Sequence, residues 1–116
     1  MLSHFLACAA ISAFTTAAQP VNSATDWFVG YIAPTPALSS TFTVAVGQTI
    51  EFDIVIEDEN PFGALGFVMF SMPAGASIDP PSPIVVWGDG INPTILSTTF
   101  SWTPTADQVG INAASF

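Results

Sequence analysis

Residues 50–57 read Ile-Glu-Phe-Asp-Ile-Val-Ile-Glu, so large apolar side chains occupy the even positions while Glu51, Asp53 and Glu57 occupy odd ones. A period of two places alternate side chains on opposite faces of a β-strand. We therefore expect a strand with one buried face and one acidic face in water. Residues 41–46 alternate in the same way, and Gly47 follows them, which predicts a turn and a second, adjacent strand.

The same period extends along most of the chain. Residues 65–72 are apolar at both odd and even positions, which predicts a central strand covered on both faces. The chain has ten prolines, most of them between the apolar runs, and they disfavour long helices. Seven short strands separated by turn signals are typical of an antiparallel β-sandwich, which is the fold class we predict. The other predicted strands are 27–32, 84–87, 95–102 and a run that begins at residue 110.

The composition excludes several classes of function. The chain has 116 residues, nine Asp or Glu, one His and no Lys or Arg, which gives a formal net charge of −9. Binding to nucleic acid or to an anionic membrane surface relies on cationic side chains, so we expect neither. Paired carboxylates can hydrolyse glycosides, but nothing in the chain marks a cleft or supplies an assisting His, Cys or Lys. We therefore expect no enzymatic activity.

The N-terminal residues 1–23 are predicted to be a signal peptide. An apolar run of about ten residues, 5–14, is too short to cross a hydrocarbon core of ~30 Å but suits the central part of a secretory signal. Small residues follow it, so we expect cleavage after Ala18 or near Ser23. No transmembrane segment is expected in the chain.

The exported part, residues 24–116, then forms a single domain without disulfides. His4 and Cys8 are the only His and Cys of the chain, and both lie within the predicted signal. An exported domain without cysteine must be stabilised by a packed core or by neighbouring modules. This favours export by a bacterium over an animal secretory pathway.

Three segments together resemble the immunoglobulin-like, cadherin-like (dystroglycan-type) modules of bacterial secreted and cell-surface proteins. They are 46–52 (Val-Gly-Gln-Thr-Ile-Glu-Phe), 72–79 (Met-Pro-Ala-Gly-Ala-Ser-Ile-Asp) and 99–110, which contains Phe-Ser-Trp-Thr-Pro-Thr and ends on Gln-Val-Gly. The last segment is the most specific, and the resemblance covers about residues 40–116. The final strand of the family continues beyond the position of Phe116, so the resemblance implies a C-terminally incomplete module.

The resemblance implies an immunoglobulin-like sandwich that acts as a non-catalytic structural or adhesion module, secreted or on the cell surface. Its partners would be neighbouring domains of the same protein or cell-surface and matrix molecules. Two alternatives stay open: a carbohydrate-binding accessory domain of a secreted enzyme, and a plain spacer without a ligand.

The densest group of charges is a candidate calcium site. Five acids lie within residues 51–59, and Asn60 follows them. Calcium prefers carboxylate and amide oxygens, and the resemblance implies a site at Asp58 and Asn60, with Glu57 as a third ligand. The alternative is that these acids only keep the outer face of a strand in water.

The three tryptophans are the remaining candidates. Trp102 shares a predicted strand face with Leu96 and Phe100, so we interpret it as a core residue. Trp87 lies beside the turn Gly-Asp-Gly at 88–90, and we name it as a candidate for contact with a glycan. The turn itself lacks the lysine and the following helix of a phosphate-binding loop.

Overall fold

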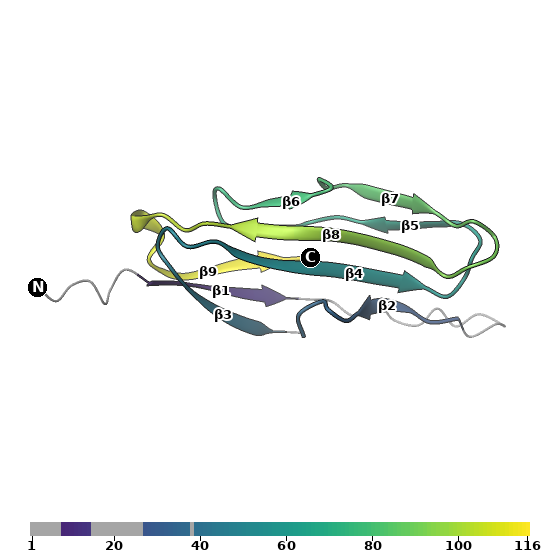
Figure 1. Cartoon of the computed structure of the whole chain (residues 1–116), viewed down its shortest axis with the longest axis horizontal. Helices are drawn as coiled ribbons and strands as arrows, with labels where there is room; N and C mark the ends of the chain where they lie inside the picture. Colours follow the sequence, from purple (N-terminus) through teal and green to yellow (C-terminus); the bar gives the residue numbers. More distant parts are fainter. Residues whose placement is uncertain (1–7, 15–26, 38) are drawn as a thin grey trace, which may run out of the picture.

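The computed structural model of the chain describes residues 8–14, 27–37 and 39–116. These residues form nine strands and one short 3-10 helix, and no α-helix occurs among them (Figure 1). The elements are β1 (Cys8–Phe14), β2 (Val29–Ile32), β3 (Ser40–Ala45), β4 (Ile50–Asp58), β5 (Ala64–Phe67), β6 (Ser77–Asp79), β7 (Ile84–Trp87), β8 (Thr94–Trp102), η2 (Ala106–Gln108) and β9 (Gly110–Ser115).

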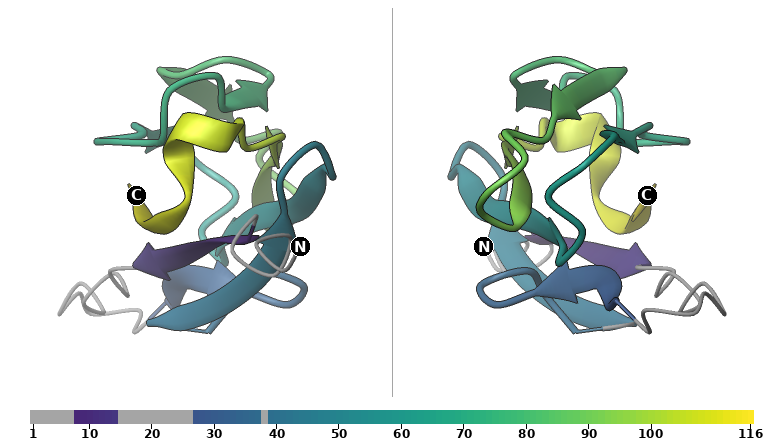
Figure 2. Two further views of the ribbon diagram at one scale, coloured as in Figure 1. Left: turned by 90° about the vertical axis from the view of Figure 1, so that its left-hand side faces the viewer. Right: turned by 90° about the vertical axis from the view of Figure 1, so that its right-hand side faces the viewer.

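The strands form a sandwich-like, all-β fold. One layer is a four-stranded antiparallel sheet in the order β2-β4-β8-β6. The facing layer contains the order β3-β1-β9 and the antiparallel pair β5-β7. An isolated bridge between Ser71 and Ser115 joins β9 to the segment that follows β5. The end-on views show the strands arranged around a common interior (Figure 2). The predicted fold class is thus confirmed at the level of an all-β sandwich, and the immunoglobulin-like class within it stays a prediction.

The pair β4 and β8 forms the middle of the four-stranded layer. All nine residues of β4 are in register with β8, from Ile50 opposite Trp102 to Asp58 opposite Thr94. The alternation read from the sequence holds: Ile54 and Ile56 are buried, whereas Glu51 and Asp53 are exposed. On β8 the even positions are buried, as predicted.

The core is aromatic in its centre. The rings of Phe42 and Phe52 stack at 5.4 Å between centroids, and Phe52 stacks on Phe100 at 4.7 Å. The ring centroids of Phe116 and Tyr31 lie 5.8 Å apart, and the Phe116 side chain is buried. Stacked and tilted aromatic pairs add to the free energy gained by burial alone. The buried apolar residues are Val44, Ile54, Ile56, Leu65, Phe67, Ile78, Ile84, Leu96, Phe100, Trp102, Ala114 and Phe116.

One predicted pairing is wrong. The runs 41–46 and 50–57 do form strands, but β3 and β4 belong to different layers rather than lying side by side. The turn between them is anchored elsewhere, because the Gly47 N–H donates to the Pro104 carbonyl at 2.9 Å, and Gly47 has a φ of +82°. Phe42 and Phe52 therefore meet across the core instead of along one sheet.

The predicted strand at 65–72 is shorter and less covered than expected. β5 ends at Phe67, and Val68 and Phe70 are exposed. No layer lies outside β5 in the described part of the chain, so only the side chains that alternate inward, Leu65 and Phe67, are buried. The strand β6 was not predicted from the sequence, because its three residues are too few for a period to show.

The apolar N-terminal run has a defined place in the sheet. Cys8–Phe14 forms β1, paired with β3 on one side and β9 on the other. The predicted cleavage positions, Ala18 and Ser23, lie outside the described residues. Among the residues that are described, no helix has the length and apolar character needed to cross a membrane.

Candidate functional site

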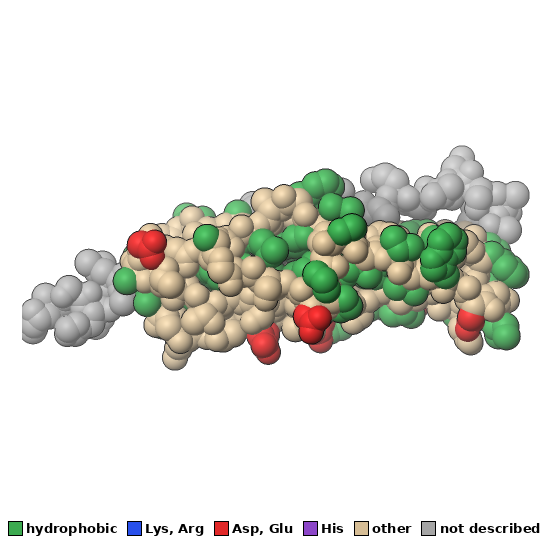
Figure 3. All heavy atoms as spheres, turned by 90° about the horizontal axis from the view of Figure 1, so that it is seen from above, with side chains coloured by type: hydrophobic (Ala, Val, Ile, Leu, Met, Phe, Trp, Pro, Cys, Tyr) green, Lys and Arg blue, Asp and Glu red, His purple; other side chains and the backbone are tan. Residues whose placement is uncertain are grey.

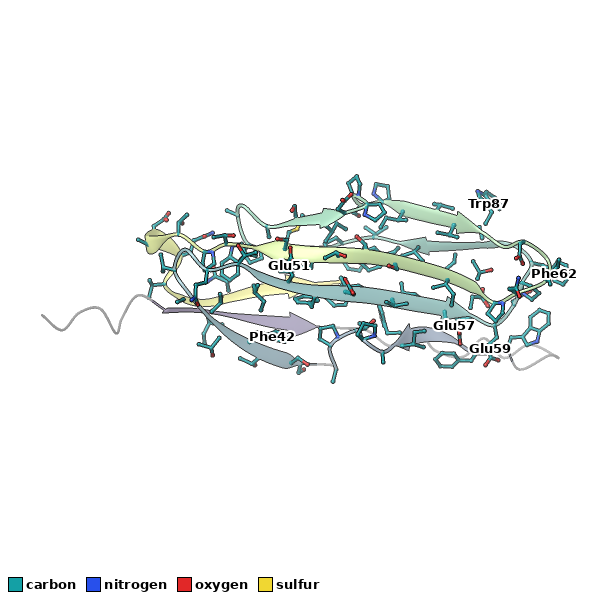
Figure 4. All side chains as sticks on the ribbon, in the orientation of Figure 1. Phe42, Glu51, Glu57, Glu59, Phe62 and Trp87 are labelled. Atoms are coloured by element: carbon teal, nitrogen blue, oxygen red, sulfur yellow. The ribbon has the colours of Figure 1, made fainter. Side chains whose placement is uncertain are left out.

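Four large apolar side chains are exposed at one end of the sandwich, and we call them the apolar end. They are Phe28, Phe62, Trp87 and Ile91, with exposed fractions of 41%, 62%, 76% and 81%. Phe62 and Trp87 both lie at the end of the molecule where β4 and β7 finish (Figure 4). Exposed aromatic clusters are uncommon on proteins that have no partner. The apolar end is therefore the first candidate for a binding surface.

Backbone hydrogen bonds hold the two loops of this end together. The Gly88 N–H donates to the Gly63 carbonyl at 2.8 Å, and the Gly90 N–H donates to the Pro61 carbonyl at 2.8 Å. The Phe62 ring packs beside Gly90, where an added Cβ would lie 3.4 Å from the ring. The loops that carry Phe62 and Ile91 are thus joined into one unit.

Phe28 is attached to the same end by its main chain. Its N–H donates to the Glu59 carboxylate at 3.1 Å, and the Glu59 N–H donates to the Phe28 carbonyl at 2.9 Å. The backbone hydrogen bond lies one residue beyond Val29 opposite Asp58, the last pair of β2 with β4, and the bond to the carboxylate adds a side-chain contact. It brings an aromatic residue from before β2 to the edge of the loops.

Trp87 has only small residues beside it on the neighbouring strand β5. It lies opposite Ala64 in the pairing of β5 with β7, and the next outward pair is Val85 opposite Gly66. Because Ala64 and Gly66 are small, nothing on β5 covers the indole or the Val85 side chain, and both are exposed. Seen from above, apolar side chains gather over the middle and right-hand part of this face (Figure 3).

Asp89 organises the loop beneath Ile91. Its carboxylate accepts hydrogen bonds from the N–H groups of Ile91 and Asn92, each at 2.8 Å, and from the Asn92 side-chain amide at 2.9 Å. These hydrogen bonds, those from Asn92 first, lower the pKa of Asp89 from its ordinary 3.8 to about 2. A hydrogen-bonded carboxylate prefers its charged form, so the loop is best ordered above that pH.

We predict that Asp89 titrates near pH 2, well below its value in the unfolded chain. Because the folded pKa is lowered, the carboxylate stabilises the loop at pH 4 and above, and this contribution is lost as the pH falls from about 4 to about 2. NMR titration of the carboxyl carbon measures the pKa directly. Asn92→Ala removes one side-chain donor and is expected to raise it, whereas titration near 3.8 in the unaltered chain would contradict the loop geometry.

The structure brings the predicted calcium ligands only partly together. Glu57 and Asp58 are neighbours on β4, so their side chains project to opposite faces of the strand. Asp58 Oδ1 accepts the Asn60 N–H at 2.9 Å, and Asn60 Oδ1 accepts the Phe62 N–H at 2.9 Å. Within the described part of the chain, no group of three or more His, Cys, Asp or Glu side chains is arranged to hold a metal ion.

Sequence reasoning singled out Trp87 but missed the other members of the apolar end. Phe62 and Ile91 each lie inside a turn segment, between Pro61 and Gly63 and between Gly90 and Asn92. Turns are mostly solvent-exposed, so a large apolar residue flanked by turn residues was the available signal. Asp58 and Asn60 are also found at this end, where their side chains shape the loop that presents Phe62.

Comparison of the chain with protein-family models, with curated proteins and with solved structures gave no match. The resemblance to immunoglobulin-like, cadherin-like modules thus stays a prediction from the sequence.

Proposed function

We propose that this chain is a non-catalytic binding module of a bacterial secreted or cell-surface protein, with a structural or adhesive role. The observation that carries the proposal is the apolar end, in which two loops tied by backbone hydrogen bonds present exposed aromatic and aliphatic side chains. The partner would be a neighbouring domain of the same protein or a molecule of the cell surface or matrix.

The geometry suits binding more than it suits a spacer. Aromatic side chains with few rotatable bonds contribute most when they enter a partner's surface, since little entropy is lost. The carboxylates of Glu59 and Asp89 flank the apolar end and meet no basic side chain among the described residues, since the chain has no Lys or Arg and its one His lies outside them. A partner with apolar pockets and a basic rim would complement this surface.

A carbohydrate partner is the second candidate, and Trp87 is the observation that favours it. Its indole is 76% exposed on a face where the paired residue is only Ala64. A sugar ring can stack on such an unobstructed aromatic surface, with its hydroxyl groups turned towards nearby polar side chains. Both candidate partners would contact the apolar end. One adhesion experiment with variants of this end can therefore distinguish a carbohydrate partner from a protein partner.

We predict that cells displaying the full chain adhere to coated surfaces through the apolar end. Plates would be coated either with extracellular-matrix glycoproteins or with insoluble polysaccharides. Trp87→Ala combined with Phe62→Ala is expected to reduce attachment at least tenfold, the loss of roughly 1.4 kcal/mol or more. Attachment that is confined to polysaccharide and lost with Trp87→Ala alone would identify the carbohydrate-binding alternative.

The matched control for this experiment is Ile111→Ala. Ile111 is 86% exposed, so it resembles the members of the apolar end, but it lies near the start of β9 at the other end of the sandwich (Figure 1). If attachment falls equally in the Trp87→Ala, Phe62→Ala double variant and in the Ile111→Ala variant, or falls in neither, the proposal is contradicted and the plain spacer is favoured.

The calcium hypothesis has its own prediction. Because the acids are spread along β4 rather than gathered, we expect calcium and magnesium to raise the melting temperature equally, by relieving charge repulsion. Calorimetry with either ion up to about 10 mM covers the affinity range of weak extracellular calcium sites, ~10⁻⁴ to 10⁻³ M. A larger rise with calcium, abolished by Asp58→Asn, would instead establish the site at Glu57, Asp58 and Asn60.

A further inference from the structure

The strand β1 is the middle strand of the three-stranded sheet β3-β1-β9, so it separates β3 from β9. It pairs antiparallel with β3 over six residue pairs, from Cys8 opposite Ala45 to Ala13 opposite Ser40. It pairs parallel with β9 over six more, from Ala9 opposite Gly110 to Phe14 opposite Ser115. Within the described residues β1 is the one hydrogen-bonded neighbour of β3. We call this place the strand slot.

Removal of β1 would leave the strand slot with two open edges facing each other. Adjacent strands lie ~4.8 Å apart, so β3 and β9 are separated by about two such spacings. Each would present a row of unpaired N–H and C=O groups, which favours pairing with another strand. The flanking strands also carry core residues, since Val44 of β3 and Ala114 of β9 are both buried. An empty slot would therefore be costly both in hydrogen bonds and in apolar surface.

The residues of β1 are also those of the predicted signal peptide. A segment that is cleaved on export cannot remain in the sheet, so the exported domain needs another strand in the same place. The occupant must be extended, because the slot is one strand wide. The segment that it replaces, Cys-Ala-Ala-Ile-Ser-Ala-Phe at 8–14, is apolar and rich in small residues, and we expect the same of the occupant.

We propose that the gap between β3 and β9 is a strand-accepting site, which β1 fills in the intact chain and an extended apolar segment of a partner chain fills once β1 has been removed by cleavage. This rests on the export that the proposed function assumes. The partner segment adds to both edges at once, which is β-augmentation on two sides. Because the chain has a net charge of −9 and no Lys or Arg, basic residues flanking the segment would be favoured.

The experiment exchanges β1 for a peptide in the full chain. A specific protease site is inserted between Gln19 and Pro20, and the folded chain is cut there. The probe is a fluorescent peptide with the sequence of residues 8–14, serine in place of Cys8, and two lysines at each end. We expect the cut chain to take up one peptide per molecule under mild denaturant, measured by anisotropy. Uptake by the uncut chain should be at least 100-fold weaker, because tethered β1 competes at an effective concentration in the millimolar range.

Two controls test whether the peptide binds in the strand slot. A probe with Ile11→Pro cannot pair on both sides, and we expect it to bind at least tenfold more weakly. Ala45→Cys places a second cysteine opposite Cys8 in the register of β1 with β3. Directly opposed residues of antiparallel strands have Cα atoms about 4.5–5.5 Å apart, which suits a disulfide. After cutting, the oxidised chain should not bind the peptide, because the disulfide holds β1 in place. The same sample should bind it once the disulfide is reduced.

Three outcomes would overturn the proposal: no uptake by the cut chain, equal uptake of the proline probe, or equal uptake by the oxidised and reduced forms of the Ala45→Cys chain. The exchange is measured on a chain cut in solution, so it does not depend on the cell. N-terminal sequencing of exported protein tests the signal prediction separately. If the cut chain takes up the peptide but cells that display the full chain do not adhere, the proposed adhesive function is rejected and the strand-accepting site is not.

Discussion

Trp102→Ala is expected to lower the free energy of unfolding by about 3–5 kcal/mol, the largest effect that we predict for a single substitution. Trp102 is 1% exposed, at the end of β8 opposite Ile50, and its indole N–H donates to the Ala74 carbonyl at 3.3 Å. Truncation leaves a large cavity and removes one of two donors to that carbonyl, which keeps the hydrogen bond from the Gln108 side-chain amide at 2.8 Å. For a domain of this size we expect the melting temperature to fall by about 15 °C or more.

Urea denaturation followed by circular dichroism measures the effect of Trp102→Ala without relying on tryptophan fluorescence. Trp87→Ala is the matched control, because the same side chain is lost from a position that is 76% exposed. We expect that variant to change stability by no more than about 0.5 kcal/mol. Similar losses in the two variants would contradict the burial of Trp102 and the exposure of Trp87.

Gly88→Ala is expected to separate the two loops of the apolar end. A Cβ at this position would lie 2.1 Å from the Pro61 carbonyl oxygen and 2.7 Å from its carbon, closer than such atoms approach. The obstacle is backbone, so the loop must move, and the hydrogen bond from Gly88 to Gly63 is lost with it. We expect a loss of about 1–3 kcal/mol in stability, together with displacement of Phe62 and weaker adhesion.

Gly66→Ala is the control for the change at Gly88. Gly66 lies in β5, and an added Cβ would meet only the Ile84 carbonyl at 3.9 Å, an ordinary contact. We expect this variant to be neutral or slightly stabilising. Amide chemical shifts of residues 59–63 would report the movement of the loop. If Gly88→Ala left them and the melting temperature unchanged, the close packing of the two loops would be wrong.

The two surfaces that we assign functions lie in different parts of the fold. The strand slot is bounded by β3 and β9, whereas Phe62 and Trp87 lie at the far end of β4 and β7 (Figure 1). A module with two separate contact surfaces can be held by one partner and bind another. The two surfaces share no residue. A substitution in one surface should therefore leave the affinity of the other surface for its partner unchanged within experimental error.

The amino-acid sequence by itself determined the strands in which apolar and polar residues alternate, and which of their side chains face inward. Alternation at 50–57 and 95–102 correctly predicted the buried faces of β4 and β8, including Trp102. It also indicated the turn at Gly47, which has a φ that glycine adopts easily. These features are local, because a period of two depends only on the geometry of one strand.

Only the tertiary structure decided which strands are neighbours and which apolar residues remain in water. β3 and β4 are close in sequence but belong to different layers, and Cys8–Phe14 pairs with β9 at the other end of the chain. Phe62 and Trp87 are apolar yet exposed, since nothing in the described fold packs outside them. Pairing and coverage depend on contacts between distant segments, and the apolar character of a residue does not state whether a second layer will reach it.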